Sequence, residues 1–168
     1  PKPLLFGMKI VENTKQIRIG TAVRNIVFSN PILVAEEALV FDLLSKGRLD
    51  LGVGSGYRPW EFEGFRIPKE ESKDRFLESL EIINQAMRGE PFSFKGKYHD
   101  IPEVSLVPKP YYSKPRPKIF LASGDMAMVK LAAEKDYGVM SFSTSSKDHL
   151  VNLYNTYVEV AKPLGHDI

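Results

Sequence analysis

Apolar residues recur every second residue in some segments of the chain and every three to four residues in others. The first spacing predicts strands and the second predicts helices. Strands are expected over residues 16–23, 48–53, 118–122 and 138–142. Helices are expected over residues 4–13, 30–46, 68–89, 126–134 and 148–161. The chain is therefore expected to contain one helix followed by four strand–helix units.

This alternation predicts an α/β fold with a parallel sheet, because parallel neighbours need a crossover connection that is usually a helix. The expected strands are short and mostly apolar on both faces, which is typical of strands buried beneath helices. An irregular insertion over residues 92–106, with candidate short strands around Gly96, and a proline-rich connector over 107–117 precede the third strand. We expect residues 1–168 to form a single domain.

Helix 30–46 carries clear boundary signals. Asn30 or Ser29 is expected to cap its start, with Pro31 in the first turn, and Gly47 is expected to end it.

Composition argues against several classes of function. The chain has 23 basic and 21 acidic residues, a net charge of +2, which gives no electrostatic argument for binding nucleic acid or an anionic membrane. It has no cysteine, and its three histidines lack the spacing of metal ligands, so no metal site is expected and His99 is expected at the surface. No apolar run could cross a bilayer and no signal peptide is visible, so a cytoplasmic location is expected.

The segment 49–59 (L-D-L-G-V-G-S-G-Y-R-P) is the most informative for chemistry. An apolar strand ends here in three glycines, which lack a Cβ and let a ligand approach the backbone closely. The dinucleotide motif G-x-G-x-x-G would need a glycine at Tyr57 or Pro59, and no helix is expected directly after Pro59. The phosphate-loop ending Gly-Lys-Ser/Thr is also absent. A strand followed by a flexible turn stays open as the alternative.

Functional groups of parallel α/β sheets lie at the carboxyl ends of the strands. Four segments occupy these ends: 21–24, 54–58, 122–125 and 141–144. They are small, glycine-rich and hydroxyl-bearing, which suits a flat, phosphate-bearing ligand better than a hydrolytic centre. Ser123 and Gly124 also precede a helix, whose N-terminus attracts anions.

The chain resembles the bacterial luciferase-like flavin-dependent monooxygenase superfamily. The matching segments are I-R-I-G-T-A-V (17–23), N-P-I-L-V-A-E-E (30–37), S-K-G-R-L-D-L-G-V-G-S-G-Y (45–57), R-F-L-E-S-L-E-I-I (75–83) through G-K-Y-H (96–99), V-P-K-P (107–110), P-K-I-F-L-A-S-G (117–124) and L-A-A-E-K (131–135). They occur in the family's order and cover nearly the whole chain. The resemblance implies a (β/α)8 barrel that binds reduced FMN, or a deazaflavin in one branch, at the carboxyl ends of its strands.

The resemblance also implies cofactor-binding roles for seven residues at these ends. They are Thr21, Ala22, Gly54, Gly56, Tyr57, Ser123 and Gly124. Ser123 and Gly124 would hold the phosphate, although Asp125 at the same turn could cap the helix and repel it. Arg58 and Trp60 are candidates for contact with the substrate, and no catalytic residue can be named.

Two further groups of side chains have alternative interpretations. Trp60, Phe62 and Phe65 could form a lid over an apolar substrate. The glutamates at 36–37 could act as general bases, but we favour carboxylates that lie on the helix surface or form ion pairs, with Arg48 as a candidate partner.

The length of the chain limits what the resemblance can imply. A complete barrel needs roughly 250 residues, whereas this chain has 168. We therefore expect a partial (β/α)8 barrel with about four parallel βα units and two exposed sheet edges, which invite pairing. Either the sequence belongs to a longer product, which we favour, or two chains complete each other as a homodimer.

We thus expect a flavin-dependent monooxygenase that uses FMN and oxygen to oxidise a small, apolar organic substrate, with a flavin reductase as a candidate partner. One alternative is a deazaflavin-dependent oxidoreductase that moves hydride without oxygen. The other is a non-catalytic half-barrel that serves only in subunit association.

Overall fold

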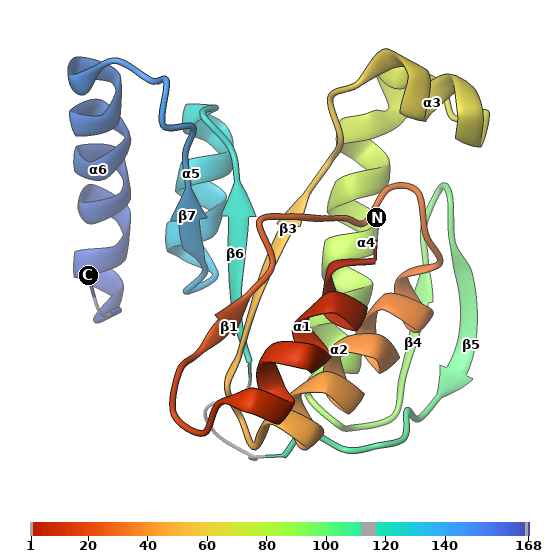
Figure 1. The fold of residues 1–168 in the computed structure, drawn as a ribbon. Helices are drawn as coiled ribbons and strands as arrows, with labels where there is room; N and C mark the ends of the chain where they lie inside the picture. Colours follow the sequence, from red (N-terminus) through yellow and green to blue (C-terminus); the bar gives the residue numbers. More distant parts are fainter. Residues whose placement is uncertain (1, 112–116, 167) are drawn as a thin grey trace.

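The computed structural model describes residues 2–111, 117–166 and 168 (Figure 1). Its helices are α1 (Pro3–Asn13), α2 (Pro31–Ser45), α3 (Pro59–Phe65), α4 (Ser72–Ala86), α5 (Met126–Glu134) and α6 (Lys147–Ala161), with 3-10 turns η1 (Lys69–Glu71) and η2 (Lys162–Leu164). Its strands are β1 (Ile19–Gly20), β2 (Arg24–Asn25), β3 (Leu49–Gly54), β4 (Phe92–Lys95), β5 (Asp100–Val104), β6 (Lys118–Ala122) and β7 (Gly138–Met140). Residues 112–116 of the expected connector lie outside the described residues.

The sheet is parallel, as the alternation of strands and helices predicts. Its order is β1-β3-β6-β7, and β2 also pairs with β3. Leu51 lies opposite Ile119, and Leu121 lies opposite Val139. This order leaves β7 at one end of the sheet, beside α5 and α6 (Figure 1).

The expected strand over residues 16–23 is interrupted. Only Ile19–Gly20 pairs with β3, and pairing resumes at Arg24–Asn25 after residues 21–23 leave the ladder. The peptide bond between Ala22 and Val23 is cis. The expected strand 138–142 likewise ends early, at Met140. A pattern of alternating residues cannot indicate such interruptions, because the residues concerned still alternate.

The core lies between β3, β6 and the helices α2 and α4. The side chains of Leu51 and Leu121 point into this layer and are almost completely buried. Asn30 caps α2 as expected, since its Oδ1 accepts a hydrogen bond from the Ile32 amide at 2.9 Å. The helix ends where Lys46 and Gly47 both adopt positive φ, so the predicted end is confirmed.

The insertion contains an antiparallel hairpin, β4-β5, whose turn includes Gly96, so the expected short strands are confirmed. His99 is half-buried rather than at the surface, and its Nδ1 lies 3.3 Å from Glu78 on α4. The expectation of a surface histidine was wrong because this turn packs onto α4.

A helix, α3, begins directly at Pro59, where none was expected. Proline is well suited to the first position of a helix, because its fixed φ is helical and its missing N–H would be unpaired there in any case. In the part of the chain that the structure describes, no helix is long and apolar enough to cross a membrane.

Candidate functional site

The chain leaves β1 at Thr21, beside the middle of β3. Its hydroxyl donates to the Gly52 carbonyl at 2.7 Å, and its amide donates to the Asp50 carbonyl at 3.1 Å. A Cβ on Gly52 would overlap the Thr21 carbonyl oxygen and the terminal methyl of Met140. Thr21 is therefore buried and fixes the backbone beside β3, whereas its neighbour Ala22 is exposed.

Protein side chains occupy the space beside two of the predicted glycines. A Cβ on Gly54 would lie 2.7 Å from Val23 Cγ2. Gly56 adopts φ +80°, and a Cβ there would lie 2.8 Å from the Phe28 ring. Glycine is thus needed at both positions for close packing of the chain against itself.

An aromatic cluster anchors α3 above this edge. The Phe28 ring lies edge-on to Phe62, with 4.9 Å between centroids, and stacks on Phe65 at 5.0 Å. Phe62 is only 3% exposed, so the interpretation of Phe62 as part of a lid was wrong. Trp60 and Phe65 are exposed and could still face a ligand.

Arg58 lies between two exposed aromatic rings at the tip of the loop after β3. Its guanidinium carbon is 5.4 Å from the Tyr57 ring centroid and 5.8 Å from that of Trp60. The Arg58 Nε donates to the Tyr57 hydroxyl at 3.2 Å, and this contact raises the pKa of Arg58 above its usual value. The three residues therefore form one unit that combines a cation with apolar surface.

A cavity of about 310 Å³ opens between the carboxyl ends of β3 and β6 and the start of α4. Its polar lining consists of hydroxyl groups, two lysines and two carboxylates: Ser55, Lys69, Glu70, Ser72, Lys73, Ser123 and Asp125. The Ser72 hydroxyl donates to the Ser55 carbonyl at 3.0 Å, which ties α4 to the end of β3. The cavity thus brings the loops of β3 and β6 together with α4.

Asp125 at this cavity caps α5, as expected. Its Oδ1 accepts from the Ala127 amide at 2.8 Å, while its Oδ2 lies 4.0 Å from Lys73 Nζ. The Asp125 amide in turn donates to the Ser123 hydroxyl at 3.0 Å. The carboxylate therefore has two favourable electrostatic partners, which weakens its repulsion of a bound anion.

Sequence reasoning missed the contribution of α4 to this cavity. Lys69, Ser72, Lys73 and Phe76 follow the three-to-four-residue spacing of one helix face, and this spacing was available in the sequence. On the other side of the β6 loop, His149 Nε2 lies 3.2 Å from where a Gly124 Cβ would be. No pattern in the sequence links positions 124 and 149.

Arg48, the candidate partner of the two glutamates, does not pair with Glu37. Arg48 instead donates to the Thr14 hydroxyl at 2.9 Å and to the Ser45 carbonyl at 2.7 Å. Glu37 forms ion pairs, one of the two favoured interpretations, with Lys2 at 3.0 Å and with Arg24 at 3.4 Å.

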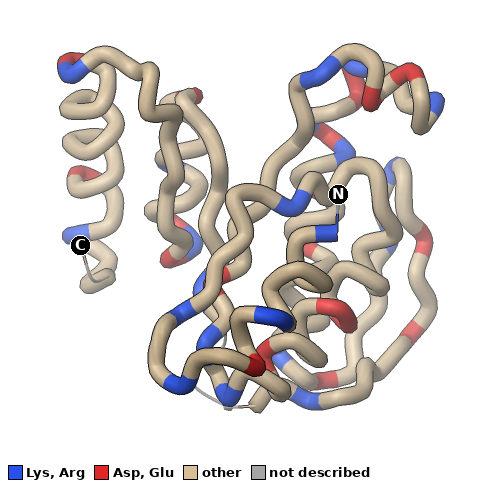
Figure 2. Tube along the Cα trace, in the orientation of Figure 1, with Lys and Arg blue, Asp and Glu red and all other residues tan. Residues whose placement is uncertain are grey.

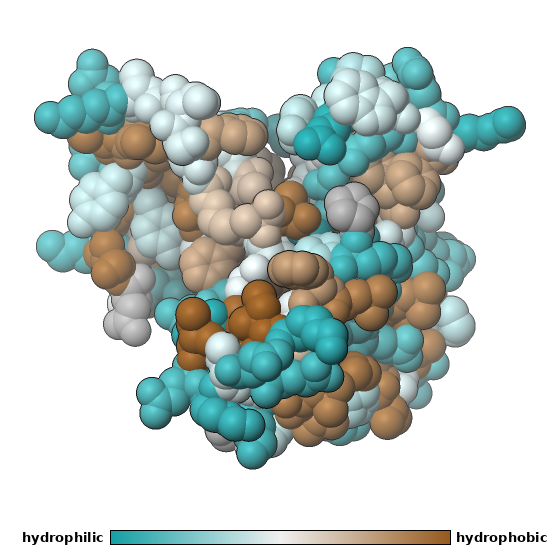
Figure 3. Space-filling view, viewed as in Figure 1, coloured by the Kyte–Doolittle hydropathy of each residue, from teal (hydrophilic) through white to brown (hydrophobic). Residues whose placement is uncertain are grey.

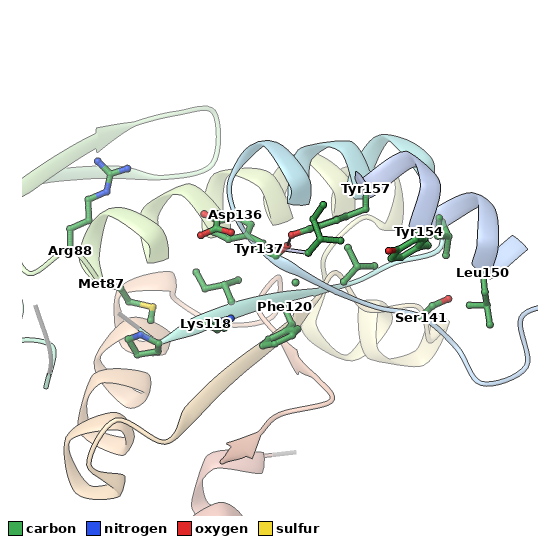
Figure 4. A pocket seen from close by; sticks show the side chains of 16 residues that line it. Met87, Arg88, Lys118, Phe120, Asp136, Tyr137, Ser141, Leu150, Tyr154 and Tyr157 are labelled. Atoms are coloured by element: carbon green, nitrogen blue, oxygen red, sulfur yellow. Dashed lines mark hydrogen bonds between the residues drawn. The ribbon is translucent and has the colours of Figure 1, made fainter. Parts of the chain in front are cut away.

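A second hollow, of about 1030 Å³, follows the edge strand β7 (Figure 4). Apolar and aromatic side chains from α6, with Phe120 of β6, line much of it, including Leu150, Leu153 and Tyr154. Within the described residues β7 pairs with β6 alone, so its other edge faces this hollow. The unpaired edge of β7 beside this hollow could accept another strand.

Among the described residues no group of three His, Asp or Glu side chains could hold a metal ion. The cavity instead presents serine hydroxyls, two lysines and two carboxylates, and exposed aromatic rings lie on the loop after β3 and on α3. Such a set can bind a phosphate and a flat ring.

Known proteins share this fold. Monooxygenase RslO1 from Streptomyces bottropensis matches with a TM-score of 0.95 and 28% identity, over 100% of this chain and 51% of that one. The oxygenating constituent of 3,6-diketocamphane monooxygenase from Pseudomonas putida, solved in complex with FMN, matches with a TM-score of 0.85 and 27% identity, over 100% and 49%. These matches confirm the predicted α/β fold as about half of a luciferase-like barrel chain.

A curated relative uses a different cofactor. The F420-dependent glucose-6-phosphate dehydrogenase of Amycolatopsis mediterranei is 31% identical over 147 residues, which are 85% of this chain and 43% of that protein. The chain thus spans about half the length of the relatives it matches. A model of the luciferase-like monooxygenase family matches residues 2–168, and the chain belongs to that family.

Proposed function

We propose that this chain supplies part of the flavin site of an FMN-dependent monooxygenase. The observation that carries the proposal is the match over the whole chain to a solved monooxygenase constituent in complex with FMN. The family contains enzymes that depend on FMN and enzymes that depend on F420. When bound, reduced flavin supplies the electrons that let oxygen react with an organic substrate.

The 310 Å³ cavity is the proposed position of the flavin phosphate. Lys73 offers a positive charge there, and the hydroxyls of Ser72 and Ser123 line the same space. Because Asp125 caps α5 and faces Lys73, its charge is partly balanced before any anion binds. Charge-assisted hydrogen bonds to phosphate are stronger than neutral ones.

The flavin ring would lie along the strand ends, where the backbone at Ala22 and the Tyr57 ring are exposed. In this proposal Thr21 and Gly54 position that backbone rather than contact the ring with side chains. Arg58 and Trp60 would contact the substrate, and the exposed aromatic surface there supports a small apolar organic molecule. A flavin reductase is the proposed partner, since the diketocamphane relative is described as an oxygenating constituent.

A lysine substitution tests the phosphate position. Lys73→Met in the full chain should weaken FMN binding about tenfold, because it removes one partly exposed charged contact. Binding of riboflavin, which has no phosphate, should not change. Lys130→Met on α5, outside the cavity, is the matched control. Equal losses for FMN and riboflavin, or equal effects of both substitutions, would place the phosphate elsewhere.

The second candidate is an F420-dependent oxidoreductase, favoured by the 31% identity to an F420-dependent dehydrogenase. The two candidates differ in their use of oxygen. An FMN monooxygenase consumes oxygen in step with substrate, whereas hydride transfer from a deazaflavin does not. Oxygen consumption together with direct titration of both cofactors separates them.

A further inference from the structure

The strand register divides the residues of the parallel sheet between its two faces. Residues that are neighbours in register point to the same face, and successive residues of one strand point to opposite faces. Arg24 lies opposite Val53, and both side chains are buried on the face that carries the helices, where Arg24 contacts Glu37 of α2. The next residue, Asn25, lies opposite Gly54 and therefore points to the other face, which we call the second face.

The neighbours of the strand glycines agree with this assignment. A Cβ on Gly54 would lie 3.3 Å from Asn25 Oδ1, and a Cβ on Gly52 would overlap the terminal methyl of Met140. Met140 in turn lies opposite Ala122 in register. Within the described strands, the carboxyl half of the second face is thus built from two glycines, an alanine and a methionine, with Asn25 as the polar side chain among them.

The charged residues of the second face lie at its amino end. Asp50 lies opposite Lys118 in register, and Arg18 binds the Asp50 carboxylate at 2.7 Å. Figure 2 shows the carboxyl halves of β6 and β7 in tan, without a charged residue. Figure 3 shows a notch above this end of the sheet, between the loops of β6 and β7 and helix α3, with pale and brown surface below it. Asn25 therefore adds a neutral polar group to a surface of small and apolar side chains.

The side-chain amide of Asn25 is free to bind a ligand. The residue is half-buried, and no described residue forms a hydrogen bond with its carboxamide. The hydroxyl of Thr21, by contrast, already donates to the Gly52 carbonyl. A carboxamide has donors and an acceptor side by side, so it can form two hydrogen bonds with a partner that presents an adjacent N–H and carbonyl. A ligand that excluded water here without such groups would leave the amide unpaired, which is unfavourable.

We propose that Asn25 binds the polar edge of the flavin ring, an inference that rests on the proposed function. The pyrimidine end of this ring carries alternating carbonyl and N–H groups, which match the donor and acceptor of a carboxamide. The rest of the ring is flat and largely apolar, and it matches the glycines and alanine of the second face, because ligand sites combine apolar surface with a few orienting polar groups. A deazaflavin has the same pyrimidine end, so Asn25 would bind either cofactor.

A variant and a flavin analogue together test this contact in the full chain. Asn25→Ala should weaken the binding of FMN and of riboflavin equally, by about tenfold, because the lost hydrogen bonds go to the ring and not to the phosphate. The analogue 3-methylriboflavin lacks the N–H of the pyrimidine edge, so the wild type should bind it about tenfold more weakly than riboflavin. N25A should bind the two ligands equally, because the contact is already absent. Asn155→Ala, at an exposed amide on α6, is the matched control and should change none of these affinities.

Circular dichroism and thermal melting check that the variants fold. Asn25→Leu keeps the size of the side chain and should lose the same affinity, so a gap left by alanine cannot account for the result. Three outcomes would overturn the inference: riboflavin binding by N25A that equals the wild type, an equal loss in N155A, or an equal effect of the 3-methyl group in wild type and N25A. Each of these leaves the proposed flavin site intact, provided that the wild type binds FMN. A wild type that binds neither flavin would instead contradict the proposed function, and this inference with it.

Discussion

The Glu78 carboxylate is expected to hold the β4-β5 hairpin onto α4, and its replacement gives a sharp test of the fold. Its Oε1 accepts from the Lys97 amide at 2.6 Å, and its Oε2 accepts from the Tyr98 amide at 3.0 Å and faces His99 Nδ1 at 3.3 Å. The Glu78 side chain is only 18% exposed. Burial alone would raise the pKa of Glu78, but the hydrogen bonds from Tyr98, Lys97 and His99 together outweigh it and lower the pKa.

The variant Glu78→Gln replaces one acceptor oxygen by a donor that faces a backbone donor. Hydrogen bonds to charged groups contribute about 1.5–3 kcal/mol each, so we expect the free energy of unfolding to fall by about 2 kcal/mol. For a chain of this size the melting temperature should fall by roughly 4–8 °C. Chemical and thermal denaturation of the full chain measure both quantities.

The dependence on pH follows from the lowered pKa. Because the carboxylate is more acidic in the folded state than its ordinary value of 4.5, its contribution is fully present above about pH 4.5 and is lost as the pH falls through the folded value. The difference between wild type and E78Q should therefore be constant near neutral pH and shrink in acid. E81Q on the same helix is the control, since Glu81 accepts a bond only from Gln85 among the described contacts. If E78Q were as stable as the wild type at neutral pH, or if E81Q lost as much unfolding free energy, Glu78 would not hold the hairpin onto α4.

Two further predictions concern the strand ends and α3. Gly52→Ala should abolish or strongly reduce folding, because the new Cβ would overlap the Thr21 backbone. Gly64→Ala is the control: its Cβ would meet no atom within 4 Å and should stabilise α3 by about 0.5–1 kcal/mol. Yields and melting temperatures of both variants check this prediction, and a well-folded G52A variant would contradict it. Phe62→Ala should lower the free energy of unfolding by about 3–5 kcal/mol, because it removes one ring from the buried aromatic cluster. Trp60→Ala, at an exposed ring, should change the free energy of unfolding little. Equal losses for the two variants in urea titrations would contradict this difference in packing.

Much of the fold could be predicted because its signals are local. The alternation of strand and helix periods gives the parallel sheet, and Asn30 and Asp125 can be identified as caps from their positions before helices. The short strands of the β4-β5 hairpin around Gly96 could also be predicted from the sequence. Each of these features depends on residues that are close together in the chain.

The interruption of the first strand could not be predicted, because its cause is a contact over a long sequence separation. Thr21 turns where its carbonyl meets Gly52, and only the folded sheet brings these residues together. The partners of Arg48 were mispredicted for the same reason, since Thr14 lies 34 residues away. By contrast, the signal for α3 is local but was misinterpreted. Pro59 was expected to prevent a helix, whereas it occupies the first position of one.

The family could be identified from the sequence, whereas the location of the flavin site and the roles of its residues stay predictions. The resemblance to luciferase-like proteins directed attention to the strand ends, and the family is confirmed. The cofactor roles of Thr21, Gly54 and Gly56 stay predictions, and their immediate neighbours are protein atoms. Lys73 entered the site only through the packing of α4 against the loops of β3 and β6.

Retention of flavin is the measurement that tests the central claim most directly. The full chain is incubated with FMN or with riboflavin, desalted, and examined for flavin absorbance and for the dissociation constant of each ligand. We expect FMN to be retained and to bind more tightly than riboflavin, because Lys73 and the hydroxyls of the cavity would hold its phosphate. A protein that retains no FMN, or that binds both flavins equally, would contradict a flavin site built on these strand ends.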